Sequence, residues 1–313
     1  MQLQGRSLLT LRDFSQAEIA ALLELSARVK RERREGRRLQ RLAGYSLAMV
    51  FEKLSTRTRC AFESAFGEEG GHPVFLSAND IHLGKKESLE DSARVFGGMF
   101  DILAYRGFAQ STVETLSAYS GIPVINALTN EYHPTQVLAD FLTIQEEFKT
   151  LKGVSLAYVG DGENNVAHSL MIGAAIMGMK CTVVAPEGFQ PNPDFVMGLA
   201  PLVAASGAEI AISDNLASGV KGADAVYTDV WVSMGMEEEK SNREEMLSPY
   251  QVNDRVMELT GRPGAIFLHC LPAIKGKEVT FDVIEGGRSR VWQEAENRKH
   301  TIKATILGLL GLS

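Results

Sequence analysis

The chain carries two series of short apolar runs, separated by stretches of more polar composition. The runs of the first series lie at 45–51, 73–76, 101–105 and 122–126, and those of the second at 154–159, 181–185, 208–212, 224–228 and 265–268. The runs are continuous and do not alternate with polar residues, which is typical of strands in a parallel sheet covered by helices on both faces. The pattern therefore predicts nine buried strands.

The stretches between these runs have helical character. Apolar residues recur at helical spacing within 88–99. The stretch 134–147 begins with Pro134, and the backbone N–H that proline lacks is not needed in the first turn of a helix. The same character extends over 164–179, 194–206 and 294–312. Because strand and helix alternate twice over, the sequence predicts an α/β fold of two doubly wound domains with central parallel sheets.

The length of the chain agrees with two domains. It has 313 residues, and a domain takes roughly 150. We place the division at Lys149–Gly153, which gives one domain of residues 1–149 and a second of residues 150–293.

Charge and cysteine content narrow the possible functions. The net charge of −7 argues against nucleic acid as the main partner, and the basic stretch 28–41 is more typical of a solvated helix end. Cys60, Cys181 and Cys270 are too few and too scattered for a disulfide framework or a CxxC metal site. No run approaches the roughly 18 apolar residues of a membrane span, and the first residues lack a secretory apolar region. We therefore expect a cytoplasmic protein with no membrane partner.

The first candidate site is the segment 51–59, which follows one predicted strand and precedes a predicted helix. Hydroxyls, guanidinium groups and free N–H groups at a helix start make a site for an anion. A helix cap explains one hydroxyl, but the segment has three, at Ser55, Thr56 and Thr58, together with Arg57 and a second arginine. Its spacing is not GxxxxGK[ST], so a nucleotide hydrolase is not indicated.

Two further polar segments follow predicted strands of the first series. Arg106 ends one strand, at the edge where parallel sheets bind their ligands. His133 and Gln136 lie one helical turn apart at another strand–helix junction, so both can donate hydrogen bonds to one carbonyl oxygen. The structural alternative for Arg106 is a surface side chain that caps a loop. For the segment of His133 and Gln136 it is a helix N-cap next to a histidine whose hydrogen bonds are already made.

The second series has its own polar strand ends. The turn Gly160–Asn165 is glycine-rich, but Asn165 stands where a dinucleotide fingerprint needs its third glycine, so NAD binding is disfavoured. The Asn165 amide can instead orient a polar substrate. Asp229 supplies a carboxylate suited to an amine, and 233–235 is interpreted as a hinged loop. The alternative for Asp229 is an N-cap.

Cys270 follows the last predicted strand. Most such cysteines are inert small hydrophobes. Adjacent strand residues point to opposite faces, so we do not expect His269 to serve as its base. The carbonyl of Leu271 can accept a hydrogen bond from an amine.

Taken together, these segments resemble the transcarbamoylases, the aspartate/ornithine carbamoyltransferase family. The resemblance extends from Gly5 to Arg298. The segments 229–235 and 269–272 resemble the ornithine branch, because the aspartate branch is expected to carry a His-Pro-Leu-Pro-Arg type segment at the second position.

The resemblance implies an amino-terminal domain for carbamoyl phosphate, a carboxy-terminal domain for ornithine, and a final helix, 294–313, that packs back on the first domain. It implies a homotrimer with shared active sites and a place in arginine metabolism. The implied carbamoyl phosphate ligands are Ser55, Thr56, Arg57, Thr58, His82 (reaching a neighbouring subunit), Arg106, His133, Gln136, Cys270, Leu271 and Arg298. The implied ornithine ligands are Asn165, Asp229, Ser233 and Met234.

The reaction implied is attack by the neutral δ-amine of L-ornithine on the carbamoyl carbon, which gives citrulline and phosphate. Arg106, His133 and Gln136 are then expected to polarise the carbamoyl oxygen, and Cys270 to lie near the amine. No metal or organic cofactor is expected. The alternatives are a transcarbamoylase for putrescine or a modified ornithine, a non-catalytic binding protein on the same fold, and a dinucleotide-dependent dehydrogenase, which the glycine spacing disfavours.

Overall fold

The computed structural model describes residues 3–77, 80–84, 86–232 and 237–313, and it divides into two compact units. Unit 1 comprises residues 1–142 and 296–313, and unit 2 comprises residues 143–295. The division falls inside two helices, so each of these helices begins in one unit and ends in the other. The predicted α/β class with two parallel-sheet domains is confirmed.

Unit 1 has a four-stranded sheet in the order β2-β1-β3-β4, with every neighbouring pair parallel. Its elements are η1 (Leu11–Asp13), α1 (Gln16–Arg34), β1 (Ser46–Phe51), α2 (Thr56–Gly67), β2 (His72–Ser77), α3 (Leu89–Met99), β3 (Ile102–Arg106), α4 (Gln110–Ser120), β4 (Val124–Leu128), most of α5 (Pro134–Phe148) and the later part of α13 (Val291–Leu309).

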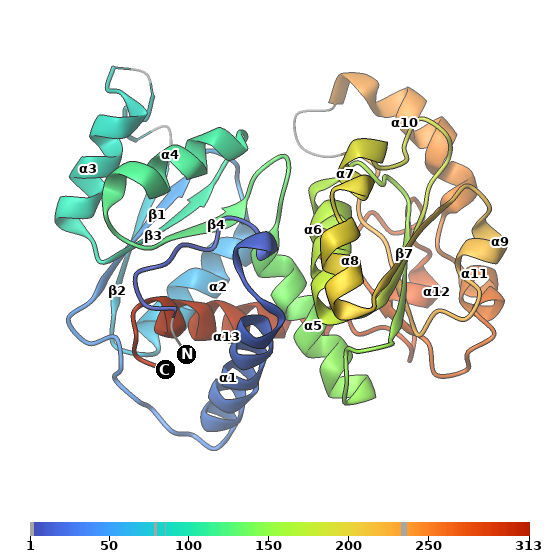
Figure 1. The fold of residues 1–313 in the computed structure, drawn as a ribbon, viewed down its shortest axis with the longest axis horizontal. Helices are drawn as coiled ribbons and strands as arrows, with labels where there is room; N and C mark the ends of the chain where they lie inside the picture. Colours follow the sequence, from blue (N-terminus) through green and yellow to red (C-terminus); the bar gives the residue numbers. More distant parts are fainter. Residues whose placement is uncertain (1–2, 78–79, 85, 233–236) are drawn as a thin grey trace. The chain divides into compact units, whose positions relative to one another are not determined.

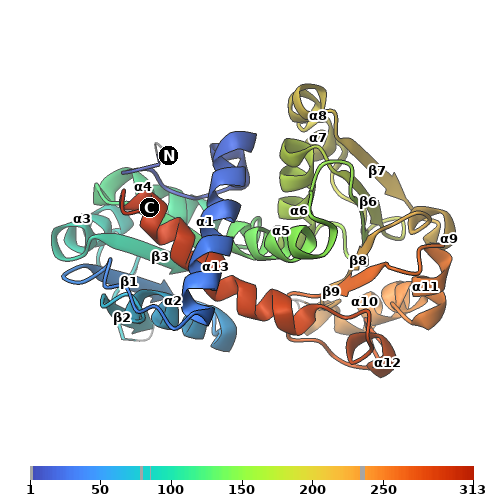
Figure 2. The same cartoon turned by 90° about the horizontal axis from the view of Figure 1, so that it is seen from below.

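Helices cover both faces of this sheet (Figure 1). Val50, Leu103 and Tyr105 point to the face that α3 and α4 cover, and they pack there against Phe96 and Leu116. On the other side, α1 and α13 lie side by side (Figure 2), and Lys30 Nζ donates to Asn297 Oδ1 at 2.6 Å between them. The end of the chain thus belongs to the core of unit 1.

Unit 2 has a five-stranded parallel sheet in the order β7-β6-β5-β8-β9. Its elements are β5 (Ser155–Val159), α6 (Asn165–Met177), β6 (Lys180–Val184), α7 (Pro193–Met197), α8 (Ala200–Ser206), β7 (Glu209–Ser213), α9 (Leu216–Gly219), β8 (Ala225–Tyr227), η2 (Glu237–Glu239), α10 (Lys240–Leu247), η3 (Ser248–Tyr250), α11 (Asp254–Leu259), β9 (Ile266–Leu268) and α12 (Phe281–Ile284).

Alternate residues of these strands face opposite cores. Val159, Val226 and Phe267 belong to the cluster formed with α11 and α12, whereas Tyr158 and Tyr227 stack on the other face with ring centroids 5.9 Å apart. Among the described residues, the longest helices fall short of the length and apolarity that would carry them across a membrane.

The helix predicted over 194–206 is wrong as a single element, because α7 ends at Met197 and α8 begins at Ala200. Pro201 is the cause. It has no N–H to donate to the carbonyl one turn earlier, and its ring disfavours helical backbone at the preceding residue.

A buried ionic cluster joins α13 to the rest of unit 1. Lys303 is 3% exposed, and its Nζ lies 3.1 Å from Glu68 Oε2 and 3.2 Å from Glu69 Oε1. Burial raises the pKa of Glu68, but hydrogen bonds from Lys303, Arg33 and Lys299 outweigh it and hold that pKa at about 2. The cluster therefore stabilises the charged carboxylate.

We expect Lys303→Met to lower the free energy of unfolding by about 3–5 kcal/mol, because two carboxylates lose their shared buried cation. Thermal unfolding at neutral pH measures this loss. Since the folded pKa of Glu68 lies below its ordinary value of 4.5, its contribution is present above pH 4.5 and is lost as the pH falls toward 2. The variant should therefore lose less stability than the parent protein over that acid range, and an equal loss in both proteins would contradict the assignment.

Candidate active site

Each sheet has one position where neighbouring strands are followed by helices on opposite faces, and ligands bind at such positions, beyond the carboxyl ends of the strands. In unit 1 this position lies between β1 and β3, and in unit 2 between β5 and β8. Several candidate residues from the sequence lie at these two edges, among them Ser55, Arg106 and Asp229. We therefore describe a half-site in each unit.

The first half-site begins at the N-terminus of α2. Ser55 is the N-cap, and its Oγ accepts a hydrogen bond from the Thr58 N–H at 3.2 Å. Thr58 is buried in the first turn, whereas Thr56 is exposed. Arg59 belongs to a different surface, because its guanidinium lies over the Phe75 ring at 3.8 Å. Only one of the two arginines of the segment is thus left to serve this half-site.

Arg298 of α13 contacts residues near the N-terminus of α2. Its Nη1 donates to Gln136 Oε1 at 2.6 Å, and its Nη2 lies 3.4 Å from Thr58 Oγ1. Gln136 Nε2 in turn donates to Asp140 Oδ1 at 2.8 Å. The side chains of α2, α5 and α13 are therefore joined by hydrogen bonds, and the guanidinium of Arg298 is held next to the start of α2.

His133 lies among positive charges and is 4% exposed. Burial lowers its pKa well below the ordinary range, and the guanidinium groups of Arg298, Arg106 and Arg57 lower it further. The imidazole is consequently neutral near pH 7, so it carries one N–H donor and adds no charge to the three arginines. Three cations around a neutral donor suit a ligand with two negative charges.

A short polar contact fixes the end of β3, and with it Arg106. The Tyr105 hydroxyl donates to the Glu52 carboxylate, and Glu52 N–H donates to the Arg106 carbonyl at 2.8 Å. Burial and this carboxylate raise the pKa of Tyr105, so the phenol keeps its proton and remains a donor. Gly107 lies directly against the pair, where a Cβ would overlap the Tyr105 hydroxyl and the Glu52 carboxylate.

We expect Gly107→Ala to reduce kcat/KM at least tenfold, because the added methyl group must displace the Tyr105–Glu52 contact that places Arg106. Steady-state kinetics measures the effect. Gly98→Ala is the matched control, because a Cβ at Gly98 meets no atom within 4 Å. Equal kinetics for the two variants would contradict a role for this contact.

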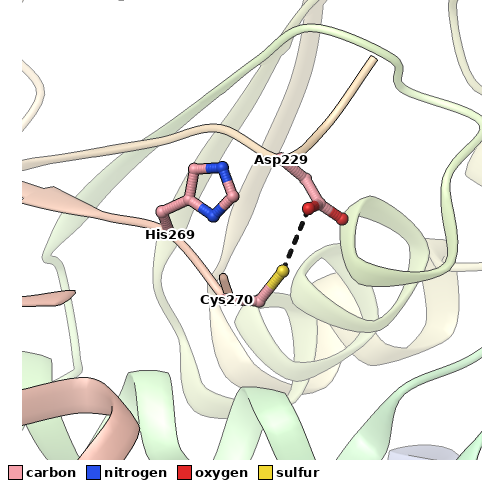
Figure 3. A group of neighbouring side chains, drawn as sticks. All are labelled: Asp229, His269 and Cys270. Carbon is pink, nitrogen blue, oxygen red and sulfur yellow. Dashed lines mark hydrogen bonds between the residues drawn. The ribbon is translucent and has the colours of Figure 1, made fainter. Parts of the chain in front are cut away.

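The second half-site is centred on Asp229, which follows β8 and is 7% exposed. Asn164 is the N-cap of α6, and its Nδ2 donates to Asp229 Oδ2 at 2.8 Å. Cys270 Sγ donates to Asp229 Oδ1 at 3.0 Å, a contact that Figure 3 shows directly. The ends of β5, β8 and β9 thus converge on one carboxylate.

The expectation that His269 and Cys270 point to opposite faces is wrong. Atoms of Asp229, His269 and Cys270 all lie within 4.8 Å of one another, because β9 ends at Leu268 and strand alternation does not continue (Figure 3). His269 is nevertheless not placed as a base. Its Nδ1 accepts from Leu271 N–H at 2.8 Å, which puts its proton on Nε2, 3.2 Å from Glu278.

The three side chains are close enough to hold a metal ion, but they are already matched as donors and acceptors. The thiol donates to the carboxylate, and both nitrogens of His269 are engaged by Leu271 and Glu278. A metal would have to replace these hydrogen bonds. The arrangement therefore describes a hydrogen-bonded cluster that sets the position of Cys270 and of Leu271, whose φ of 59° is left-handed.

Sequence reasoning missed two parts of the second half-site. Asn164, and not only Asn165, carries a contact to Asp229, which the N-cap position before α6 could have indicated. Arg243 in α10 forms a buried ion pair with Asp161, and its Nε donates to the Trp231 carbonyl at 2.7 Å. A lone arginine in a charged helix gives no signal for that pairing in the sequence.

Four predicted residues have no described contact with Ser55, Arg298 or Asp229. His82 is exposed between β2 and α3, and the described residues show no hydrogen bond from it to the other candidates. Asn165 lies at the start of α6, half-buried beside Asn164. Ser233 and Met234 lie outside the described residues.

Comparison with known proteins gives matches over nearly the whole chain. Residues 6–146 match the family model for the carbamoyl-P binding domain of aspartate/ornithine carbamoyltransferase, and residues 152–309 match that for the Asp/Orn binding domain. The chain is 57% identical over 310 residues to the ornithine carbamoyltransferase of Thermotoga maritima, with 99% of each covered. It is 56% identical over 308 residues to that of Caldanaerobacter subterraneus, with 98% of each covered. The solved structure of the Pyrococcus furiosus ornithine carbamoyltransferase is similar with a TM-score of 0.95, 42% identity and 99% of each chain covered.

Proposed function

The chain belongs to the aspartate/ornithine carbamoyltransferase family, and on that premise we propose that it transfers the carbamoyl group of carbamoyl phosphate to the δ-amine of L-ornithine. The products are L-citrulline and phosphate. The observation that carries the proposal is the gathering of Arg57, Arg106 and Arg298 around the neutral imidazole of His133.

The first half-site suits carbamoyl phosphate. Free N–H groups at the start of α2, the hydroxyls of Ser55, Thr56 and Thr58, and the nearby guanidinium groups provide donors for a phosphate dianion. The imidazole of His133 offers a neutral donor to the carbamoyl oxygen, together with Arg106 and Gln136. Each donor to a developing oxyanion is worth about 3–4 kcal/mol in other acyl-transfer sites.

The second half-site suits an amino acid with an amine. Asp229 accepts from Asn164 and Cys270, and its carboxylate can accept from the α-ammonium of ornithine. We assign Asn165, Ser233 and Met234 to ornithine as well, and Cys270 and the Leu271 carbonyl to the surroundings of the δ-amine. Acidic residues outnumber basic ones in unit 2, which favours a cationic substrate there.

The chemistry balances without a further reagent. The lone pair of the neutral δ-amine forms a C–N bond to the carbamoyl carbon, and the C–O bond to phosphate breaks. The leaving oxygen keeps the electron pair, and the proton of the amine passes to phosphate or to solvent. Holding both substrates in the right orientation contributes several kcal/mol. We expect no metal or organic cofactor.

We assign carbamoyl phosphate to residues 1–149 with the helix 294–313, and ornithine to residues 150–293. We further propose a cytoplasmic homotrimer with shared active sites, in which His82 reaches the site of a neighbouring subunit, and a role in arginine metabolism. The exposure of His82 supports its role, and the reduced thiols of Cys60, Cys181 and Cys270 suit a reducing compartment.

The direct test is to mix the protein with carbamoyl phosphate and L-ornithine and to measure citrulline colorimetrically. Putrescine and L-aspartate serve as competing substrates. We expect turnover of ornithine to exceed that of either competitor by at least a hundredfold. Equal turnover of putrescine would contradict ornithine as the substrate, and no turnover of any amine would favour a binding protein.

We expect Cys270→Ser to lower kcat and to raise KM for ornithine, because a hydroxyl replaces the thiol that donates to Asp229. A loss of about tenfold in kcat/KM is of the size expected when a positioned hydrogen-bonding group is altered. Cys181→Ser is the matched control, because Cys181 is buried in β6 and has no role in the proposed reaction. If Cys270→Ser leaves both constants unchanged, the role given to the thiol is wrong.

A further inference from the structure

Lys53 is a buried cation of the first half-site to which the proposed reaction assigns no role. Its side chain is 7% exposed, and its Nζ donates to Asn130 Oδ1 at 2.6 Å. The ammonium also lies 4.6 Å from the centroid of the Phe108 ring. The side chain is thus engaged by an amide oxygen and an aromatic face, both strong partners for a desolvated ammonium.

These partners come from three different strand ends. Lys53 follows β1, Phe108 follows β3 and Asn130 follows β4. Asn130 N–H donates to the Phe108 carbonyl at 2.8 Å, so the two partners are also joined to each other. One ammonium therefore links the connections that follow β1, β3 and β4 at the carboxyl edge of the sheet.

The same three connections carry the ligands assigned to carbamoyl phosphate. Ser55 comes two residues after Lys53, Arg106 two residues before Phe108, and His133 three residues after Asn130. The surroundings disfavour the charged form of Lys53. Burial and the positive charge of Arg106 lower its pKa, whereas the negative charge of Glu52 raises it. We infer that a charged Lys53 is retained here because it fixes the positions of Asn130 and Phe108.

We propose that Lys53 and Asn130 are positioning residues, whose hydrogen bond sets Arg106 and His133 relative to Ser55 before carbamoyl phosphate binds. This inference rests on the proposed function. It differs from two simpler interpretations. In one, Lys53 contacts the phosphate directly, and in the other it contributes only to folding stability.

A double-mutant cycle distinguishes the three interpretations. The variants are Lys53→Met, Asn130→Ala and the pair together. We expect each single variant to raise KM for carbamoyl phosphate at least tenfold while KM for ornithine changes less than threefold. Because both act through one hydrogen bond, the double variant should be no worse than Lys53→Met alone. Asn130 is exposed, so its variant is expected to fold even if Lys53→Met does not.

The matched control is Lys303→Met, which removes another buried ammonium of unit 1 that contacts Glu68 and Glu69 instead. It should lower the melting temperature and leave KM for carbamoyl phosphate unchanged. Calorimetric titration with inorganic phosphate gives a binding readout that does not require turnover.

Each contrary outcome is specific. If Lys53→Met weakens binding and Asn130→Ala does not, Lys53 contacts the phosphate and the positioning role is refuted. If both variants lower only the melting temperature, as Lys303→Met does, the role is purely structural and the proposal is again refuted. A parent protein that binds phosphate but forms no citrulline would refute the proposed function, while the binding data would still test the positioning role.

Discussion

Three guanidinium groups that act on one buried imidazole are the constraint on which the half-site of unit 1 depends. Arg57, Arg106 and Arg298 act on one buried imidazole, and each comes from a different part of the chain. Such a concentration of like charge is unfavourable in a folded protein unless neutral acceptors and fixed backbone hold it in place. Gln136 and Thr58 supply acceptors for Arg298, and the Tyr105–Glu52 contact fixes the strand that carries Arg106. In the proposed reaction, carbamoyl phosphate brings two negative charges to these groups.

The half-site of unit 2 is centred on a negative charge, whereas the half-site of unit 1 contains positive charges. Its centre is one carboxylate that accepts from an amide and from a thiol, and a second buried carboxylate, Asp161, is paired with Arg243. The two half-sites thus differ in the sign of their principal charged groups, although both occupy the same position in a doubly wound sheet. The sheet fixes where a ligand binds, and the side chains at the strand ends determine which ligand it is.

Much of this arrangement could be predicted from the sequence, because continuous apolar runs define parallel strands and polar residues at their ends mark the binding edge. Arg57 and Thr58 were identifiable from the helix start alone. What local pattern cannot provide is long-range pairing. Family resemblance assigned Arg298 and Gln136 to one site, but their mutual contact was not predicted. The contacts of Arg243 and Lys53 depend on how loops from separate strands meet. The rule of strand alternation failed at His269, because it holds only where the strand continues.

The return of α13 to unit 1 has a consequence for biosynthesis. Thr58 and Arg298 are 240 residues apart in the chain, yet they share one corner. During translation, the first 142 residues and then residues 143–295 are synthesised before Arg298 and Lys303 are added. A nascent chain that lacks this helix has neither the third guanidinium nor the buried ammonium beside Glu68. The start of α2 therefore acquires its third nearby guanidinium group only after both α/β sheets have been synthesised.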